Sequence, residues 1–403
     1  MKPPGADTVV VRDGDLNTKS ESVRRSMEQR LVGNVSALLE ARGVEATVEY
    51  RRTRPLVHTD EASVEAATDA VAAAFGVVSA SPARRVPPER DAIVDALAET
   101  ASERYDEGTY AVSVRRAHKE HPFSSQELAE EGGAAVAEAV ADRFEPTVDL
   151  DDPDLTFFVE VREDVAFLFL EKRSGPGGLP LGSQAPLVAL VSGGIDSPVA
   201  AFEAMRRGAP IVPIYARLGE FGGPDHEARA IETIRCLADY APNYDLRPYV
   251  LDAGETLSDL ADRLDEGRML AFRRLLLRAA EVIAEREGAK GIVTGEAVGQ
   301  KSSQTATNMA VTDPATTMPV HRPLSTRDKY EIEELAREIG TYDDSTIPVG
   351  CDRFAPSQPL TRSSLDGQRA REPDDLFDRA ERIARDAERV SLEPAADAVR
   401  QDT

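Results

Sequence analysis

The residues with the clearest capacity for chemistry are Ser-Gly-Gly-Ile-Asp-Ser at 192–197, which directly follow the apolar run 187–191. Two adjacent glycines let a backbone wrap closely around an anion, and a helix that begins here would point unpaired N–H groups and its positive dipole end at that anion. The GxxxxGK[ST] pattern of a P-loop is absent, so the expected anion is pyrophosphate leaving from a nucleotide cleaved between its α- and β-phosphates. An ordinary strand-to-helix turn is the alternative interpretation, but the residue types and their position favour the phosphate site.

The elements that must position this loop alternate between short apolar runs and helical stretches. The runs are 187–191, 211–215, 247–251 and 291–295, and the helical stretches are 198–208, 225–241 and 255–287. Such alternation predicts an α/β fold with a doubly wound parallel sheet, whose ligands bind at the carboxyl ends of the strands. From residue 363 the chain is rich in charge, and we expect a surface helix and a loose end.

The N-terminal half has a different order of elements. A strand at 8–15, a helix at 22–41 and a strand at 44–52 form a small α+β unit, and a second unit has helices at 61–74 and 89–103, a strand at 110–117, a capped helix at 124–144 and a hairpin at 155–173. We place the domains at 1–58 and 59–174, a Gly- and Pro-rich linker at 175–184, the parallel-sheet domain at 185–362 and a charged tail at 363–403.

Composition limits the class of protein and its compartment. Two cysteines in 403 residues are too few for a disulfide scaffold or a four-thiolate metal site. The N-terminus lacks a signal pattern and no apolar run approaches the ~18 residues of a membrane span, so we expect a soluble, cytoplasmic protein. The net charge of -24 is spread along the chain, which we interpret as adaptation to a salt-rich cytosol, so local rather than net charge indicates the partners.

The loop at 192–197 resembles the signature of the PP-loop ATP pyrophosphatases, and the chain around it resembles the tRNA 4-thiouridine synthetase (tRNA uracil 4-sulfurtransferase) family. Other family-like segments keep the same order: EKRSGPGGLPLGSQ before the loop, then GIVTGEAVGQKSSQTATNM and HRPLSTRDKYEIEELAREIGTYDDST. VSVRRAHKEHPFSSQELAEEGGAAV resembles the RNA-binding THUMP domain. The resemblance covers about residues 7 to 362 and implies a ferredoxin-like domain at 1–58, a THUMP domain at 59–174 and a PP-loop domain at 185–362.

The resemblance implies ATP and Mg²⁺ as cofactors, with no permanently bound metal. It assigns contact with ATP to the two strand ends, the loop and three later positions, namely Leu190, Val191, Ser192, Gly193, Gly194, Asp196, Ser197, Tyr215, Ala216, Arg273, Gly295 and Gln304. Without the family, Arg273 would be read as a solvated arginine next to Arg274.

Three residues are candidates for catalysis: Asp196, Lys329 and Cys351. A carboxylate at 196 can hold magnesium against the phosphates, and an ammonium at 329 can neutralise charge that develops at the α-phosphorus, although Lys329 also fits a surface lysine. Cys351 occupies the position of the family's sulfur-handling cysteine, in a loop-like context where a thiol is reachable. Cys236 falls at helical spacing with Ile231, Ile234 and Leu237, so we expect it to pack in the core.

RNA contact is expected where basic residues gather against the acidic background. Arg115, Arg116, His118 and Lys119 form one cluster, with His121 nearby, and Arg51, Arg52 and Arg54 form another. A salt-bridged surface is the alternative interpretation of either cluster.

The resemblance implies a reaction in which O4 of a tRNA uridine, at position eight, is adenylated and a sulfur nucleophile then displaces AMP to give 4-thiouridine. The matching form lacks the rhodanese-like domain of longer members, and no cysteine follows Cys351, so sulfur would come from sulfide or from a separate persulfide carrier. No CxxC pair is present for an iron–sulfur cluster. The family suggests a homodimer, and some relatives also serve thiamine synthesis.

Two other functions fit parts of this pattern. Another PP-loop enzyme, such as a different tRNA-base modifier, would share the loop without needing Cys351 or the RNA module. A non-catalytic tRNA-binding protein would carry the nucleotide site as a relic, against which the intact Gly193, Gly194, Asp196 and Ser197 argue.

Overall fold

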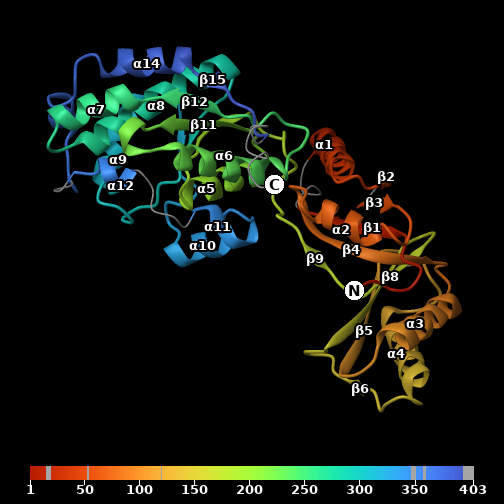
Figure 1. Ribbon diagram of the computed structural model, residues 1–403. Coiled ribbons are helices and arrows are strands. Elements are labelled where there is room, and N and C mark those ends of the chain that lie inside the picture. Colours follow the sequence, from red (N-terminus) through yellow and green to blue (C-terminus); the bar gives the residue numbers. More distant parts are fainter. Residues whose placement is uncertain (15–19, 52–53, 119, 346–350, 357–359, 394–403) are drawn as a thin grey trace, which may run out of the picture. The chain divides into compact units, whose positions relative to one another are not determined.

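The computed structural model describes residues 1–14, 20–51, 54–118, 120–345, 351–356 and 360–393. The chain divides into two compact units, residues 1–180 and 181–403, each built on its own sheet (Figure 1). No helix within the described ranges is long and apolar enough to span a membrane.

The N-terminal unit contains one continuous sheet. Its elements are β1 (Thr8–Asp13), α1 (Glu21–Ala41), β2 (Thr47–Arg51), β3 (Arg54–His58), α2 (Val64–Ala72), β4 (Val77–Val86), α3 (Arg90–Arg104), β5 (Thr109–Arg116), α4 (Ser125–Val140), β6 (Thr147–Val148), β7 (Leu155–Val161), β8 (Ala166–Phe169) and β9 (Arg173–Ser174). The strand order is β2-β3-β1-β4-β8-β7-β5-β6, and β9 also pairs with β4. Because β4 pairs antiparallel with both β1 and β8, it joins the two predicted α+β units through one sheet.

The sequence patterns did not predict β3 and β4, which pair with β1 on either side. Both strands contain a proline, Pro55 in β3 and Pro82 in β4, and proline within a run normally argues against a strand because it cannot donate to the ladder. The predicted hairpin is confirmed, since β7 and β8 pair with Val161 opposite Ala166. The predicted helix cap is confirmed too, because Ser124 and Glu127 form a reciprocal capping box at the start of α4.

The two faces of this sheet differ. One face packs against the helices, with Val9 and Val57 beneath α1 and α2 and with Val159 and Leu168 beneath α3 and α4. Alternate residues point to the opposite face, where Val10, Leu56, Ala83, Phe167 and Phe169 form a smaller apolar cluster.

The C-terminal unit is an α/β domain with a mainly parallel sheet. Its elements are β10 (Leu187–Leu190), α5 (Asp196–Arg206), β11 (Ile211–Arg217), η2 (Gly219–Phe221), α6 (Pro224–Ala238), β12 (Tyr249–Asp252), α7 (Gly254–Arg263), α8 (Arg268–Glu287), β13 (Ile292–Val293), α9 (Ala306–Thr312), η3 (Asp313–Ala315), β14 (Val320–His321), α10 (Lys329–Glu338), α11 (Tyr342–Ser345), α12 (Cys351–Phe354), α13 (Leu365–Arg369), α14 (Leu376–Asp386) and β15 (Glu388–Arg389). The strand order is β14-β13-β10-β11-β12-β15, and β15 alone among these runs antiparallel to its neighbour. The predicted doubly wound parallel sheet is confirmed: α7, α8 and α14 lie on one face and α5 and α6 on the other (Figure 1).

Two helical predictions in this unit need correction. The predicted helix 255–287 is two helices, because Gly267 adopts the left-handed region with φ 76° just before α8. The charged tail is more than a surface helix, since one face of α14 buries Leu376, Ala380 and Ala384 against α8. The predicted loose end, residues 394–403, lies outside the described residues.

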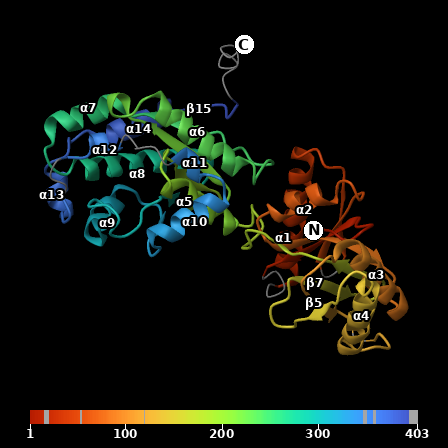
Figure 2. The ribbon, with the colours of Figure 1, turned by 60° about the horizontal axis from the view of Figure 1, so that its bottom comes forward.

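The strand order fixes where a ligand can bind. The chain runs outward from β10 through β11 to β12, then crosses back through α7 and α8 to β13 on the other side of β10. In such sheets the point where the direction of winding reverses leaves a crevice at the carboxyl ends of the strands. The loops after β10 and β13 flank that crevice, α10 lies beside α5, and α11 packs against α6 (Figure 2).

Candidate functional site

The loop after β10 is closed onto the first turn of α5. The backbone N–H of Ser192 donates to Oγ of Ser197 over 2.8 Å, and the two serine hydroxyl oxygens are 3.0 Å apart. Asp196 is the first residue of α5. The sequence therefore folds here as a compact turn at a helix N-terminus, an arrangement that suits phosphate oxygens.

The loop after β13 approaches this turn very closely at Gly295. A Cβ at position 295 would lie 2.7 Å from backbone atoms of both Asp196 and Ser197. Side chains do not tolerate such a distance to a backbone, so glycine is required for the two loops to meet.

A cavity of about 620 Å³ opens between these loops. Its size is that of a typical small-molecule site, which occupies about 300–1,000 Å³. Lys329 is part of the cavity wall. The wall also includes every residue predicted to contact ATP, namely Leu190, Val191, Ser192, Gly193, Gly194, Asp196, Ser197, Tyr215, Ala216, Arg273, Gly295 and Gln304. The structure thus brings together positions that are spread over more than a hundred residues of sequence.

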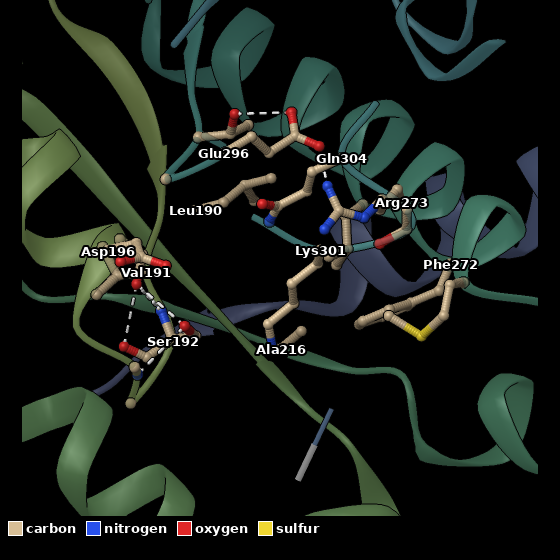
Figure 3. Close-up of a pocket in the computed structure, with 18 of the residues that line it drawn as sticks. Leu190, Val191, Ser192, Asp196, Ala216, Phe272, Arg273, Glu296, Lys301 and Gln304 are labelled. Carbon is tan, nitrogen blue, oxygen red and sulfur yellow. Dashed lines mark hydrogen bonds and ion pairs between the residues drawn. The ribbon is translucent and has the colours of Figure 1, made fainter. Parts of the chain in front are cut away.

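The two ends of the cavity differ in chemistry (Figure 3). Ser192 and Asp196 lie at one end, beside the N-terminus of α5. Phe272 and Arg273 of α8 lie at the other end with Gln304, and Leu190 and Ala216 contribute apolar wall. The first end carries serine hydroxyls and the N-terminus of a helix, whereas the second combines apolar surface with hydrogen-bonding groups.

Arg273 is held by a network rather than solvated. NH1 of Arg273 pairs with Glu296. When the side-chain amide of Gln304 is turned so that its nitrogen donates to the carbonyl of Ala297, its oxygen accepts from NH2 of Arg273 over 3.1 Å. The adjacent Arg274 points the other way, is 1% exposed and pairs with Glu372 at 2.9 Å. The alternative interpretation of Arg273 as a solvated surface residue is therefore wrong.

The two residues assigned to adenylation are in direct contact. Nζ of Lys329, the first residue of α10, lies 2.7 Å from Oδ1 of Asp196. Both side chains retain access to solvent, with exposed fractions of 45% and 23%. A cation and a carboxylate therefore stand together at the phosphate end of the cavity.

The segment that carries Cys351 is anchored beside the cavity. Cys351 begins the short helix α12, and its side chain lies outside the described part of the structure. Phe354, in the same helix, is buried edge-on against Phe221 and Phe272, with ring centroids 5.1 and 5.7 Å apart. The next two residues, Ala355 and Pro356, line the cavity. The backbone of this cysteine thus lies close to the wall of the cavity.

Cys236 does not lie in the core. It is only partly buried on α6, and its Sγ lies 3.6 Å from the carbonyl oxygen of Gly340. Ile234 and Leu237 are fully buried, so the helix turns the thiol toward the flank of that apolar face. The prediction of core packing for Cys236 is wrong.

Comparison with known proteins agrees with this geometry. Residues 182–373 match the family described as "Thiamine biosynthesis protein (ThiI)", residues 89–171 match the THUMP domain, and residues 8–81 match the ThiI ferredoxin-like domain. A "Probable tRNA sulfurtransferase" of Halobacterium salinarum is 56% identical over 97% of this chain and 99% of its own length. A second, from Methanosarcina acetivorans, is 36% identical over 89% of this chain and 87% of its own.

The chain belongs to the tRNA sulfurtransferase family. Among solved structures, a 4-thiouridine synthetase in complex with RNA and bound ATP superposes with a TM-score of 0.81, at 30% identity, and covers 95% of this chain and 98% of that one. The family predicted from the motifs is confirmed. The domain boundaries and the roles of single residues stay predictions.

The predicted RNA-contacting residues of this family member do not all share one surface. Arg115 is exposed, but the next residue of the strand, Arg116, points to the opposite face, where it donates to the carbonyl of Phe123. His118 packs edge-on against His121, with ring centroids 6.0 Å apart. The side chain of Arg51 and the whole of Arg52 and Lys119 lie outside the described residues, as does the side chain of Arg54.

Arg115 lies near other cations, and the sequence did not indicate that they come together. We call Arg12, Arg115, Arg162 and Lys172 the cationic cluster. Burial lowers the pKa of the Lys172 ammonium, and the charges of Arg12 and Arg115 lower it further. One carboxylate, Glu160, pairs with Arg162 at 3.0 Å and with Arg12 at 3.9 Å.

The cationic cluster lies over aromatic rings on the face of the sheet opposite the helices. Nζ of Lys172 is 3.9 Å from the ring centroid of Phe158, and the guanidinium of Arg12 is 4.6 Å from that of Phe169. The two rings are stacked with centroids 5.1 Å apart. The alternation of side chains along β1 and β5 was the signal in the sequence that their cations share a face of the sheet. Only the strand pairing shows that the cations lie close together.

Proposed function

We propose that this chain thiolates a uridine of tRNA, at position eight, and consumes ATP to give 4-thiouridine, AMP and pyrophosphate. The observation that carries the proposal is the convergence of the phosphate loop, the pair Asp196–Lys329 and Arg273 in one cavity of a tRNA sulfurtransferase fold. Its relatives include a probable tRNA sulfurtransferase and a 4-thiouridine synthetase solved in complex with RNA and bound ATP, which supports the same activity and the same ligands for this chain.

The two ends of the cavity suggest how ATP binds. The triphosphate would lie at the turn formed by Ser192 and Ser197, beside the N-terminus of α5, where the first backbone N–H groups of a helix have no partner within the helix. The adenosine part would lie toward Phe272 and Arg273, whose charge is balanced by Glu296. A partly apolar end suits a nucleoside, and the N-terminus of a helix suits phosphates.

The first chemical step is adenylation of the base. O4 of uracil attacks the α-phosphorus, an O–P bond forms, and the bond to the oxygen that bridges to the β-phosphate breaks. Pyrophosphate leaves, and the N3 proton of uracil is lost because C4 now forms a double bond to N3. Lys329 would stabilise the negative charge on the phosphoryl oxygens in this transition state.

Magnesium fits the donor set at the phosphate end. Mg²⁺ is commonly held by one or two carboxylates together with substrate phosphates and water. Asp196 offers Oδ2 beside the loop, while its Oδ1 contacts Lys329. When bound, the ion would neutralise phosphate charge, and Asp196 would orient it. Within the described ranges no group of three or more His, Cys, Asp or Glu side chains is placed to hold a metal ion.

The second step replaces oxygen with sulfur. A sulfur nucleophile forms a bond to C4, the C4–O4 bond breaks, and AMP leaves with O4. If the nucleophile is a persulfide on Cys351, the product is a disulfide between C4-bound sulfur and Cys351, and another thiol must reduce it to release 4-thiouridine. Free hydrosulfide needs no such reduction. The position of α12 beside the cavity supports Cys351 as the carrier.

The RNA would be bound by the N-terminal unit. The cationic cluster supplies positive charge in a chain whose net charge is -24, and phosphate contacts require Lys and Arg.

Further parts of the proposal rest on the family alone: a sulfur donor that is sulfide or a separate persulfide carrier, and assembly as a homodimer in the cytoplasm.

The test is conversion of unmodified tRNA with Mg-ATP and excess sulfide in high salt, followed by digestion and mass spectrometry of the nucleosides. We expect 4-thiouridine that depends on ATP. Folded protein that binds tRNA and releases no pyrophosphate would instead favour a non-catalytic tRNA-binding protein. Pyrophosphate release with a product other than 4-thiouridine would favour a different PP-loop modifying enzyme.

A further inference from the structure

A carboxylate to which the motifs assign no role forms part of the cavity wall. Glu296 follows Gly295 in the loop after β13 and is 7% exposed. It lines the same cavity as Arg273 and Gln304 (Figure 3). A buried carboxylate in a nucleotide site needs an explanation, because taking a charge out of water is unfavourable unless it is paired.

Both oxygens of Glu296 are engaged by the protein. Oε1 accepts from NH1 of Arg273. Oε2 accepts from Nε of Arg322 over 2.6 Å and from the hydroxyl of Thr294 over 3.0 Å. Because Arg322 directly follows β14, this contact connects Glu296 to the segment after that strand. Arg322 is also paired with Asp313.

These contacts fix Arg273 in both position and plane. NH1 of the guanidinium donates to Glu296, and NH2 donates to Gln304 in the turned orientation of its amide, so two different nitrogens are held by two different residues. A free arginine side chain has many rotamers, and ordering it on binding a ligand costs affinity. A guanidinium that is already held in place avoids that cost.

We propose that Glu296 is a positioning residue for ATP, which acts by holding the guanidinium of Arg273 at the adenosine end of the cavity. The inference rests on the proposed function, because it takes Arg273 to contact the nucleotide. Glu296 itself faces Arg273, Arg322 and Thr294 and need not touch ATP.

The test is the dissociation constant for Mg-ATP of the full chain, measured by calorimetry without tRNA. Glu296→Gln keeps the shape but removes the charge, and we expect it to weaken binding about ten- to hundredfold, the range for a lost hydrogen bond to a charged group. At saturating ATP and tRNA, the turnover number for pyrophosphate release should stay near that of the wild type. Glu281→Gln is the matched control, because Glu281 is an equally buried, arginine-paired carboxylate on α8 outside the cavity wall.

A double-mutant cycle separates positioning from general support of the fold. If Glu296 acts through Arg273, the variant Glu296→Gln/Arg273→Met binds ATP no more weakly than Arg273→Met alone. Additive losses, or unchanged binding in Glu296→Gln, would overturn the inference. If Glu296→Gln does not fold, Glu296→Asp keeps the charge and withdraws the carboxylate from Arg273, and it must weaken ATP binding. A wild-type chain that binds no ATP would refute the proposed function itself, a result distinct from any of these.

Discussion

Replacement of Gly295 by alanine should separate the two loops that form the phosphate end of the cavity. The new Cβ would lie 2.7 Å from the carbonyl carbon of Asp196 and from both Cα and N of Ser197, and all three atoms belong to backbone. Ordinary contact begins near 3.4 Å, so the loops must move apart by about 0.7 Å. Displacements of about 1 Å can reduce a rate about 10²-fold, because the reacting groups leave their productive geometry.

The assay for Gly295→Ala is tRNA-dependent pyrophosphate release with ATP varied, alongside thermal unfolding. We expect kcat/KM for ATP to fall about 10²-fold. Overpacking of about 1–3 kcal/mol should lower Tm by several degrees. Gly133→Ala in α4 is the control, since a Cβ there meets nothing within 4 Å. Unchanged kcat/KM and Tm in Gly295→Ala would refute the reasoning, because the loops would then have room that the structure denies them.

Three further predictions concern the other parts of the mechanism. Lys329→Met removes the ammonium that lies 2.7 Å from Asp196. It should lower the turnover number for pyrophosphate release about 10²–10³-fold, with a smaller effect on KM for ATP. An unchanged turnover number would exclude Lys329 from adenylation. The double variant Arg115→Gln/Lys172→Gln should bind tRNA more weakly. The slope of log K against log salt concentration should become shallower by roughly one unit for each lost phosphate contact. An identical slope in filter-binding titrations would exclude the cationic cluster from RNA contact. Cys351→Ser should abolish thiolation from a persulfide donor while tRNA-dependent pyrophosphate release continues, and retained thiolation from that donor would show that another group carries the sulfur.

Much of the C-terminal fold follows from local pattern. The runs that became β10, β11 and β12 are apolar and end at a common rim, and the loop after β10 carries its own turn chemistry in Gly193 and Gly194. β3 and β4 in the N-terminal unit were missed, because their place in the sheet depends on pairing with β1, β2 and β8 and not on a local pattern alone.

The site was predictable where a motif names the residue and hidden where only the fold creates the contact. Asp196 and Lys329 were predicted singly, yet their separation of 133 residues gave no sign that they touch. Glu296 was missed because a glutamate three residues after the end of β13 resembles many solvated ones. Its role appears only when α8 and the segment after β14 place two arginines on it.

In the proposed mechanism, uracil O4 is activated as an adenylate before sulfur replaces it. The most direct measurement uses tRNA labelled with oxygen-18 at O4 of the target uridine, with Mg-ATP and sulfide, followed by mass spectrometry of the released AMP. If O4 attacks the α-phosphorus, each 4-thiouridine formed yields one AMP that carries the label. Unlabelled AMP accompanied by 4-thiouridine would contradict the account, because the oxygen would then have left by a route other than adenylation.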